Sequence, residues 1–225
     1  MGLWHVFYAD WQMGCCGTPF EVGDEVSWPL LLNDADGVLG GGWHDQLTKI
    51  AGPVADLPGD DADPVRILRE ESGLVVALYE HPVDILAEEE LGDERPGDWL
   101  RLVGLLTAEF HGDPCLPETR GRIRAIQILT QGFAEMAPGL LTREPVPGDR
   151  SLRAVWKCPK WFADADAGVI VTLEVPGTDS WLSHAVREAR GLPHEGTAPG
   201  AEVTGLAPAA LAELLQTLST VPERG

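Results

Sequence analysis

The amino-acid sequence predicts a mainly β protein, α+β overall, in which two small barrel- or sandwich-like β units are followed by C-terminal helices packed against them. Three observations lead to this fold class. Short segments with alternating or continuous apolar character recur along the first 176 residues. The 26 glycines and 18 prolines of the 225-residue chain provide many turns between such segments. A helical repeat of leucines appears near the C-terminus.

The first unit, residues 1–82, contains four segments that we expect to be strands. The segment LWHVFYADW at residues 3–11 is apolar on both faces, which is typical of a central strand. Pro53 cannot donate to a strand ladder, so its segment is expected at an edge or a bend. Asp63-Pro64 has the pattern of a helix start and predicts a short helix through Glu71. The four expected strands are residues 3–11, 25–32, 47–57 and 74–79.

An acidic linker is expected at residues 83–98, where seven acidic residues accompany one arginine. It separates the first unit from a second β unit at residues 99–176. A helical tail, residues 177–225, follows, with one helix over 181–190 and a second, leucine-striped helix that begins at Pro208. The expected strands of the second unit are residues 102–111, 122–130, 152–158 and 169–175.

The charge and the N-terminus limit the class of partner. A net charge of −20 argues against broad binding to nucleic acids or to anionic membranes. We therefore expect a protein or a small ligand as the partner, and no membrane. The N-terminal residues lack the features of a signal peptide, and no apolar run approaches the roughly 18 residues of a membrane span. These features predict a cytoplasmic protein, whose thiols stay reduced.

Two adjacent cysteines lie in the Gly/Pro-rich corner of the segment WQMGCCGTPFEVGDEVSW, residues 11–28. Metal sites usually place two to four residues between their cysteines, and adjacent residues of an extended chain point to opposite faces. One ion would then bind only one of the two thiolates. The other ligands would have to come from distant parts of the sequence, from among His44, His111, Cys115 and Cys158.

The sequence leaves the role of this corner open. The candidate metal ligands are Cys15, Cys16, His44 and Cys115; no cofactor is assigned, and zinc is the one considered. The interpretation that we favour is a small buried pair of thiols in a tight corner, because free cysteine is among the most buried residue types. A ring between adjacent cysteines would be strained, which argues against a redox centre. His111, beside Gly112-Asp113, is interpreted as a turn residue.

A second candidate site is basic. Residues 120–160 hold eight basic residues against three acidic ones. Arginines two positions apart on a strand share one face, where their guanidinium groups can grip a phosphate, a carboxylate or an acidic peptide. Tryptophans among basic residues are typical of surfaces that stack on bases. Alternatively, the arginines pair with carboxylates of this acidic chain. The candidate ligand- or partner-binding residues are Arg120, Arg122, Arg124, Trp156, Lys157 and Trp161.

The segment WQMGCCGTPFEVGDEVSW, together with GRIRAIQILTQ at residues 121–131, resembles an uncharacterised family of actinobacterial proteins. Members share an opening like W-x-x-x-C-C-G-x-P-F-x-V-G-D-x-V-x-W. The resemblance covers residues 4–57 closely and 99–175 more loosely, and excludes the tail from residue 177. It implies a bacterial, cytoplasmic setting and carries over no catalytic residue. Val22–Trp28 also looks like the opening of SH3-like barrels, an analogy at the level of the fold alone.

The sequence contains no G-x-S-x-G, P-loop, H-E-x-x-H or Rossmann motif, so no catalytic residue is assigned. We therefore favour a non-enzymatic acidic binding or regulatory module that engages a protein or a small ligand. The first alternative is a metal- or thiol-dependent enzyme that uses the region of Cys15 and Cys16. The second alternative is nucleic-acid binding through residues 120–160.

Overall fold

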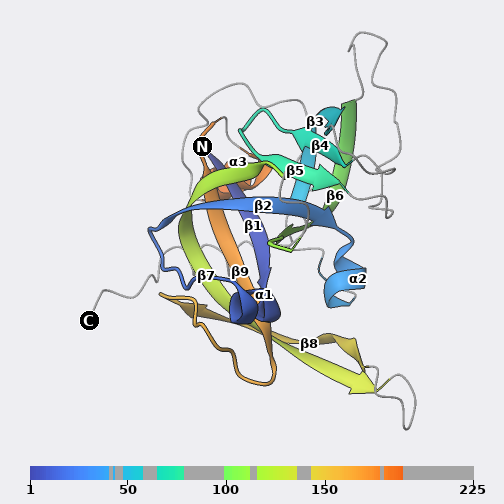
Figure 1. The fold of residues 1–225 in the computed structure, drawn as a ribbon. Helices are drawn as coiled ribbons and strands as arrows, with labels where there is room; N and C mark the ends of the chain where they lie inside the picture. The colour runs from blue at the N-terminus through green and yellow to red at the C-terminus, as the bar shows by residue number, and fades with distance from the viewer. Residues whose placement is uncertain are drawn as a thin grey trace.

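Strands make up most of the computed structural model, which describes residues 1–40, 43, 48–57, 65–78, 99–111, 116–135, 143–177 and 180–189 (Figure 1). The prediction of a mainly β protein is confirmed, and each of the eight segments expected to be a strand overlaps one. The strands are β1 (Gly2–Ala9), β2 (Glu25–Asn33), β3 (Thr48–Asp56), β4 (Arg66–Arg69), β5 (Val75–Leu78), β6 (Trp99–Ala108), β7 (Glu118–Glu135), β8 (Arg143–Val155) and β9 (Asp166–Val175).

Three helices lie among the described residues: α1 (Asp10–Cys15), α2 (Ala35–Leu39) and α3 (Trp181–Ala189). Asp34 caps the N-terminus of the short α2, because its carboxylate accepts hydrogen bonds from the backbone N–H groups of Asp36 and Gly37. In the described part of the chain, no helix has the length and apolar character needed to cross a bilayer.

Eight of the strands close into a barrel in the order β2-β5-β4-β3-β6-β1-β9-β7, because β7 pairs back with β2. The pairs β1–β6 and β2–β5 are parallel, and the other pairs of the ring are antiparallel. β2 also pairs with β6 through Leu30–Asn33. The ninth strand, β8, continues the sheet from the outer edge of β7 as an arm beside the barrel (Figure 1).

The structure does not support two small β units. β1 and β2, from the first half of the chain, pair with β6, β7 and β9 from the second half. The reason is that a strand's apolar pattern reports which faces it buries and not which strand lies beside it. The predicted acidic linker, residues 83–98, lies outside the described residues.

The barrel interior is filled by a cluster of apolar side chains to which all eight barrel strands contribute. From β1, the alternate residues Trp4, Val6 and Tyr8 belong to this cluster. Phe7, on the opposite face of β1, packs outside the barrel in a second cluster that includes Leu39 of α2. β1 is therefore covered on both faces, as its doubly apolar sequence predicts.

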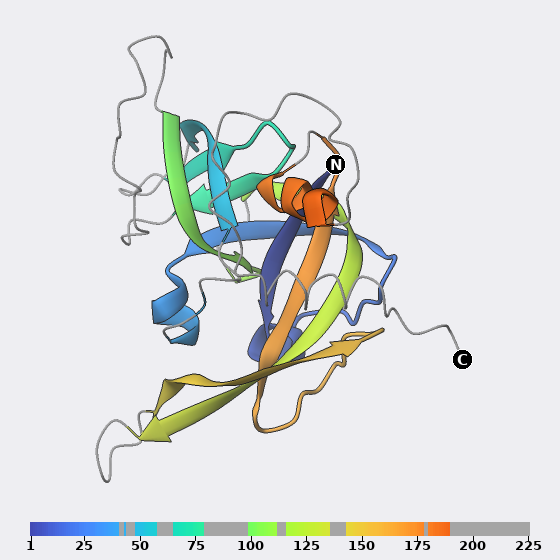
Figure 2. The ribbon, with the colours of Figure 1, turned by 180° about the vertical axis from the view of Figure 1, so that it is seen from behind.

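α3 lies across the start of β1 (Figure 2). The backbone N–H of Leu3 donates to the hydroxyl oxygens of Ser180 and Ser183, at 2.9 and 2.8 Å, and the Ser183 hydroxyl donates to the carbonyl of Met1. After residue 177, α3 is the only helix among the described residues, so a set of C-terminal helices packed on the barrel is not supported. The helix expected from Pro208 lies outside them.

The short helix expected through Glu71 is wrong over its described residues. Arg66–Arg69 form β4, an antiparallel neighbour of both β3 and β5. Ile67 and Leu68 are both buried, one on each face of the sheet. Pairing on both edges and burial on both faces outweigh the local helix-start signal, which is a weak preference by comparison.

Gly168 permits the close approach of β9 to β1, where it lies opposite Ala9. Its φ is +144°, and a Cβ there would clash with the carbonyl oxygen of Tyr8. We expect Gly168→Ala to lower the free energy of unfolding by about 2–4 kcal/mol, from strain and overpacking together. The matched control is Gly148→Ala, where φ is +80° but no atom lies within 4 Å, so that only about 1–2 kcal/mol of backbone strain is expected. Urea unfolding measures both; equal losses would contradict this account.

His5 is a buried titratable group on the outer face of β1. It is 6% exposed, and no described residue gives its Nε2 a hydrogen-bond partner. Burial lowers its pKa from 6.5 to about 4, because desolvation disfavours the imidazolium. Between these two values the unfolded chain binds a proton that the native chain does not, so the native state loses stability as the pH falls from 6.5 towards 4.

Replacing His5 should remove this acid-sensitive contribution. The free energy of unfolding of His5→Leu minus that of the wild type is the quantity to follow. We expect this difference to increase by about 3 kcal/mol when the pH falls from 7 to 4. Urea titrations of both proteins at several pH values measure the difference, in which the contributions of the many carboxylates cancel. A difference that does not change with pH would mean that His5 has the same pKa in the native and unfolded states.

Candidate metal centre

The parallel pair β1–β6 brings two distant parts of the chain to one end of the barrel. Val6 lies opposite Leu106, and Phe7 lies opposite Thr107. Because parallel strands end at the same edge of a sheet, the residues that follow β1 meet those that follow β6. α1 follows β1 directly, and His111 follows β6.

Cys15 and Cys16 lie together at the C-terminal end of α1. Cys15 is the last residue of the helix, and Cys16 has φ −137° and ψ −13°, which is not an extended conformation. Their Sγ atoms are only 2.8 Å apart, and both residues are exposed. The expectations that the thiols point to opposite faces and that they are buried are therefore wrong, because the chain turns as a helix end at this point.

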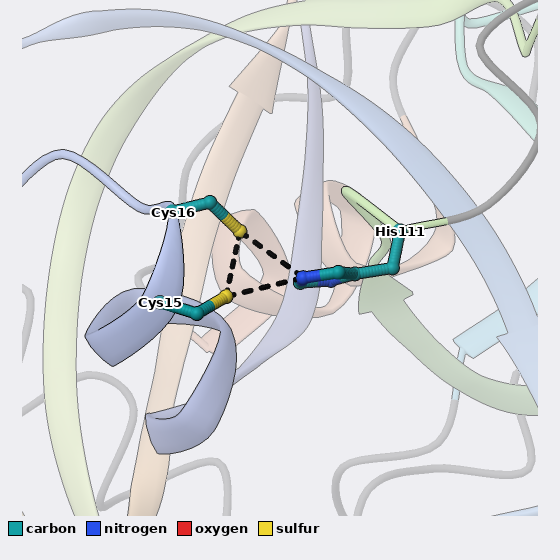
Figure 3. Close-up of side chains that lie close together, drawn as sticks. All are labelled: Cys15, Cys16 and His111. Carbon is teal, nitrogen blue, oxygen red and sulfur yellow. Dashed lines mark hydrogen bonds between the residues drawn. The ribbon is translucent and has the colours of Figure 1, made fainter.

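His111 completes a group of three metal-ligating side chains (Figure 3). Its Nε2 is 3.1 Å from Sγ of Cys15 and 3.4 Å from Sγ of Cys16. Sequence reasoning named His111 only as a distant supplier of a ligand and interpreted it as a turn residue. The spacing gives no signal for this contact, because 95 residues separate His111 from Cys16.

Gln12 fixes the two segments of this group relative to each other. It is buried, its side-chain Nε2 donates to the carbonyl of Ala108 at 2.8 Å, and its Oε1 accepts from the backbone N–H of Phe110 at 3.1 Å. Its own carbonyl accepts from the backbone N–H of Cys16 and so ends the helix beside the thiols. Sequence reasoning missed Gln12; its position between two apolar residues, Trp11 and Met13, was the available signal.

The imidazole of His111 is oriented from two sides. The ring of Trp11 packs on it with the ring centroids 4.9 Å apart. Glu109 accepts a hydrogen bond from the backbone N–H of His111, and the same carboxylate oxygen lies 4.0 Å from Nδ1. A carboxylate near Nδ1 favours a proton on that nitrogen and leaves the lone pair of Nε2 towards the two sulfurs.

A cation binds two main-chain carbonyl groups on either side of the cysteines. Nζ of Lys160 donates to the carbonyls of Met13 and Gly17, at 2.6 and 2.9 Å. A positive charge at the C-terminal end of a helix is favourable, because the carbonyl oxygens there lack partners within the helix. Met13 is fully buried, so this end of α1 is attached to the barrel core.

The local contacts favour the protonated form of the Cys16 thiol. The hydrogen bond with Cys15 is the largest cause that raises its pKa above the usual value, followed by desolvation and the charge of Cys15; Lys160 acts in the opposite direction. Both thiols also lie within hydrogen-bonding distance of the Gln12 carbonyl. A raised pKa does not prevent metal binding, because the ion displaces the proton of the thiol when it binds.

The three donors fit a tetrahedral thiophilic ion after a small adjustment. Two thiolates on one Zn²⁺ would lie about 3.7 Å apart, given Zn–S distances of about 2.3 Å. The sulfurs, now 2.8 Å apart, must therefore separate by about 1 Å, which exposed side chains achieve by rotation about χ1. Within the described residues the group has three members, which leaves the fourth tetrahedral position open to solvent or to another ligand.

The other predicted ligands do not join this group in the described structure. His44 and Cys115 lie outside the described residues. Cys158, considered as a distant supplier, is fully buried and packs in the barrel core, and burial raises its pKa to about 12. It is an inert thiol.

The structure places the predicted basic residues on and after the strands of the second half. Arg122 forms a 2.8 Å ion pair with Glu25, and Arg124 lies 3.8 Å from Glu174. Carboxylates of neighbouring strands thus accompany two of the three arginines. That these residues bind a ligand stays a prediction. Arg120, Arg122 and Arg124 are all exposed on β7.

The remaining three predicted residues follow β8. The carbonyl of Trp156 accepts a hydrogen bond from the backbone N–H of Val22, and Lys157 forms an isolated bridge with Glu21. Trp161 is 74% exposed and its ring lies beside Gly14 in α1. The ring therefore lies next to the residue that precedes Cys15 in α1.

Comparisons with known proteins identify a family but no specific function. No curated protein and no solved structure matches the chain. A family model does match residues 2–175, a range that runs from β1 to β9 and includes Cys15, Cys16 and His111. The chain therefore belongs to the family of unknown function DUF6578.

Proposed function

We propose that this protein is a metal-binding module whose Cys15, Cys16 and His111 hold one thiophilic cation, with Zn²⁺ as the first choice. One observation carries the proposal. Two sulfurs and one imidazole nitrogen, from segments 95 residues apart in the sequence, lie within 4.8 Å of one another. Exposed acidic groups are common without an ion, whereas thiolate and imidazole are the usual ligands of zinc sites.

The donor set decides the class of ion. Thiolate and imidazole are ligands of Zn²⁺ and Cu⁺, whereas Mg²⁺ and Ca²⁺ require oxygen donors. The carboxylate of Glu109 lies beside Nδ1 of His111 and not among the three donors, which is the position of an orienting partner. Two thiolates and a neutral imidazole also balance the charge of a dication.

The proposal is a form of the binding module that the sequence favours. A cytoplasmic location is consistent with it, because only reduced thiols bind the ion. The second candidate function is a zinc-dependent enzyme. It is favoured by the exposure of the three ligands found among the described residues, since catalytic zinc sites have three protein ligands and an open fourth position.

Metal stoichiometry tests the proposal directly. The full-length protein, reduced and freed of metal, is expected to bind about one Zn²⁺ per chain. Cys15→Ser, Cys16→Ser and His111→Ala each remove one donor and should weaken binding at least about 100-fold, as measured by competition with a chromophoric chelator. Cys158→Ala is the matched control, because that thiol is buried in the barrel core and is not one of the three donors, so the affinity of this variant should be unchanged. Less than about 0.1 Zn²⁺ per wild-type chain would contradict the proposal.

The role of Gln12 gives a second test. Gln12→Leu keeps all three ligands but leaves the Ala108 carbonyl and the Phe110 N–H without this partner. We expect about 10–100-fold weaker Zn²⁺ binding, because the two ligand segments are then less well aligned. Gln131→Leu is the matched control: that glutamine is also buried and donates to main-chain carbonyls, but on the β7–β8 arm.

Both glutamine variants should lose stability, by about 1–3 kcal/mol, because each leaves buried main-chain groups unpaired. Only Gln12→Leu should lose affinity. Equal affinities of the two variants would show that Gln12 supports the fold without positioning the ligands.

A further inference from the structure

The distance between the two exposed sulfurs lies between those of two chemical states. A disulfide holds its sulfurs about 2.05 Å apart, and a tetrahedral zinc site holds two thiolates about 3.7 Å apart. The Sγ atoms of Cys15 and Cys16 are 2.8 Å apart. A small change of side-chain torsion in one direction therefore opens the pair around an ion, and a change in the other direction brings it to bonding distance.

We propose that the Cys15–Cys16 pair is a redox modification site, which a peroxide converts to a vicinal disulfide with loss of the bound ion. The loss of the ion rests on the proposed function, whereas the oxidation does not. Disulfide formation removes both thiolates and leaves His111 as the one remaining donor of the described group. A single imidazole does not retain Zn²⁺ at the affinity of three donors.

The oxidation needs only a peroxide as co-reactant. In the metal-free chain, the Cys15 thiol transfers its proton to Nε2 of His111, 3.1 Å away, and its sulfur attacks one oxygen of hydrogen peroxide. The O–O bond breaks, and the leaving hydroxide takes the proton from His111 to form water, which leaves a sulfenic acid on Cys15. The Cys16 sulfur then attacks the Cys15 sulfur, and the displaced hydroxide takes the Cys16 proton as a second water. In the metal-free chain, two thiols and one peroxide thus give one disulfide and two waters. In the loaded chain, two bound thiolates and one peroxide give one disulfide, the free ion and two hydroxides, which solvent protonates.

Access and proximity direct this reaction to the pair. Both thiols are exposed, so peroxide reaches them without opening the barrel. The second sulfur is already in place, which favours the disulfide over further oxidation of the sulfenic acid to sulfinic acid. Cys158, which is fully buried, is protected from the same reagent.

The disulfide should be readily reversed. Adjacent Cα atoms are about 3.8 Å apart across a trans peptide, whereas the Cα atoms of ordinary disulfides are about 4.4–6.8 Å apart. The closed ring is therefore strained, and strained, exposed disulfides are reduced more easily than structural ones. The strain that argues against a permanent disulfide at this corner is what makes a reversible one useful.

Mass spectrometry of the full-length protein after treatment with one equivalent of hydrogen peroxide tests the inference. We expect the peptide that contains both cysteines to lose two hydrogen atoms, about 2 Da, in metal-free and in Zn²⁺-loaded protein, and dithiothreitol to reverse the change. Cys15→Ser and Cys16→Ser should not show the loss, and Cys158→Ala should show it as the wild type does. In the loaded protein, a zinc indicator should record one ion released per disulfide formed.

The outcomes separate this inference from the proposed function. Disulfide formation in a reduced chain that binds no Zn²⁺ would support the modification site and contradict the metal site. A chain that binds Zn²⁺ but yields sulfinic acid or intermolecular disulfides under peroxide would overturn the modification site alone. Retention of Zn²⁺ by the disulfide form would overturn the link between the two.

Discussion

The candidate site depends on the parallel pairing of β1 with β6. Both strands run in the same direction, and the register of Val6 with Leu106 makes them end at the same edge of the barrel. The helix after β1 and the residues after β6 are therefore neighbours in space, although about a hundred positions apart in the chain. Closure of the barrel by β7 and β2 holds this arrangement, since it leaves no free edge at which β1 or β6 could shift its register. Gln12 then couples the two strand ends through its two amide hydrogen bonds.

A change of backbone conformation over one residue decides the chemistry of the cysteine pair. In an extended chain, adjacent side chains diverge to opposite faces and cannot share an ion. At the end of α1 the carbonyl of Gln12 accepts from the N–H groups of both Cys16 and Gly17, so the chain is still helical at Cys15. Gly17 is required here, because a Cβ would lie 2.7 Å from the Cα of Met13. The Cys-Cys-Gly sequence therefore ends the helix and sets its two thiols side by side.

The apolar patterns predict strands well and their partners not at all. β1 is apolar on both faces and is indeed central, because each face contributes to a different cluster of buried side chains. Pairing between distant strands, by contrast, depends on the register and burial of both partners, which no single segment encodes, and the prediction of two units was wrong for this reason.

Only part of the site could be predicted from the sequence, namely the two adjacent cysteines, which are conspicuous in any sequence. The helix α1 could not be predicted, because it spans six residues and Ala9 gives it no side-chain cap. The contact of His111 with the cysteines could not be predicted either, because the fold alone brings these residues together.

The net charge of −20 and the local charges act on the site at different ranges. At physiological salt, charges farther than about 8 Å are largely screened, so the acidic surface mainly raises the rate at which cations arrive. The groups that would hold the proposed ion are local: two thiolates, one imidazole and the carboxylate of Glu109, opposed by the ammonium group of Lys160. The same acidic surface repels anionic thiols and disulfides but not neutral hydrogen peroxide. Long-range charge therefore favours a small cation and does not exclude a small neutral oxidant, the two reagents that we propose act on this cysteine pair.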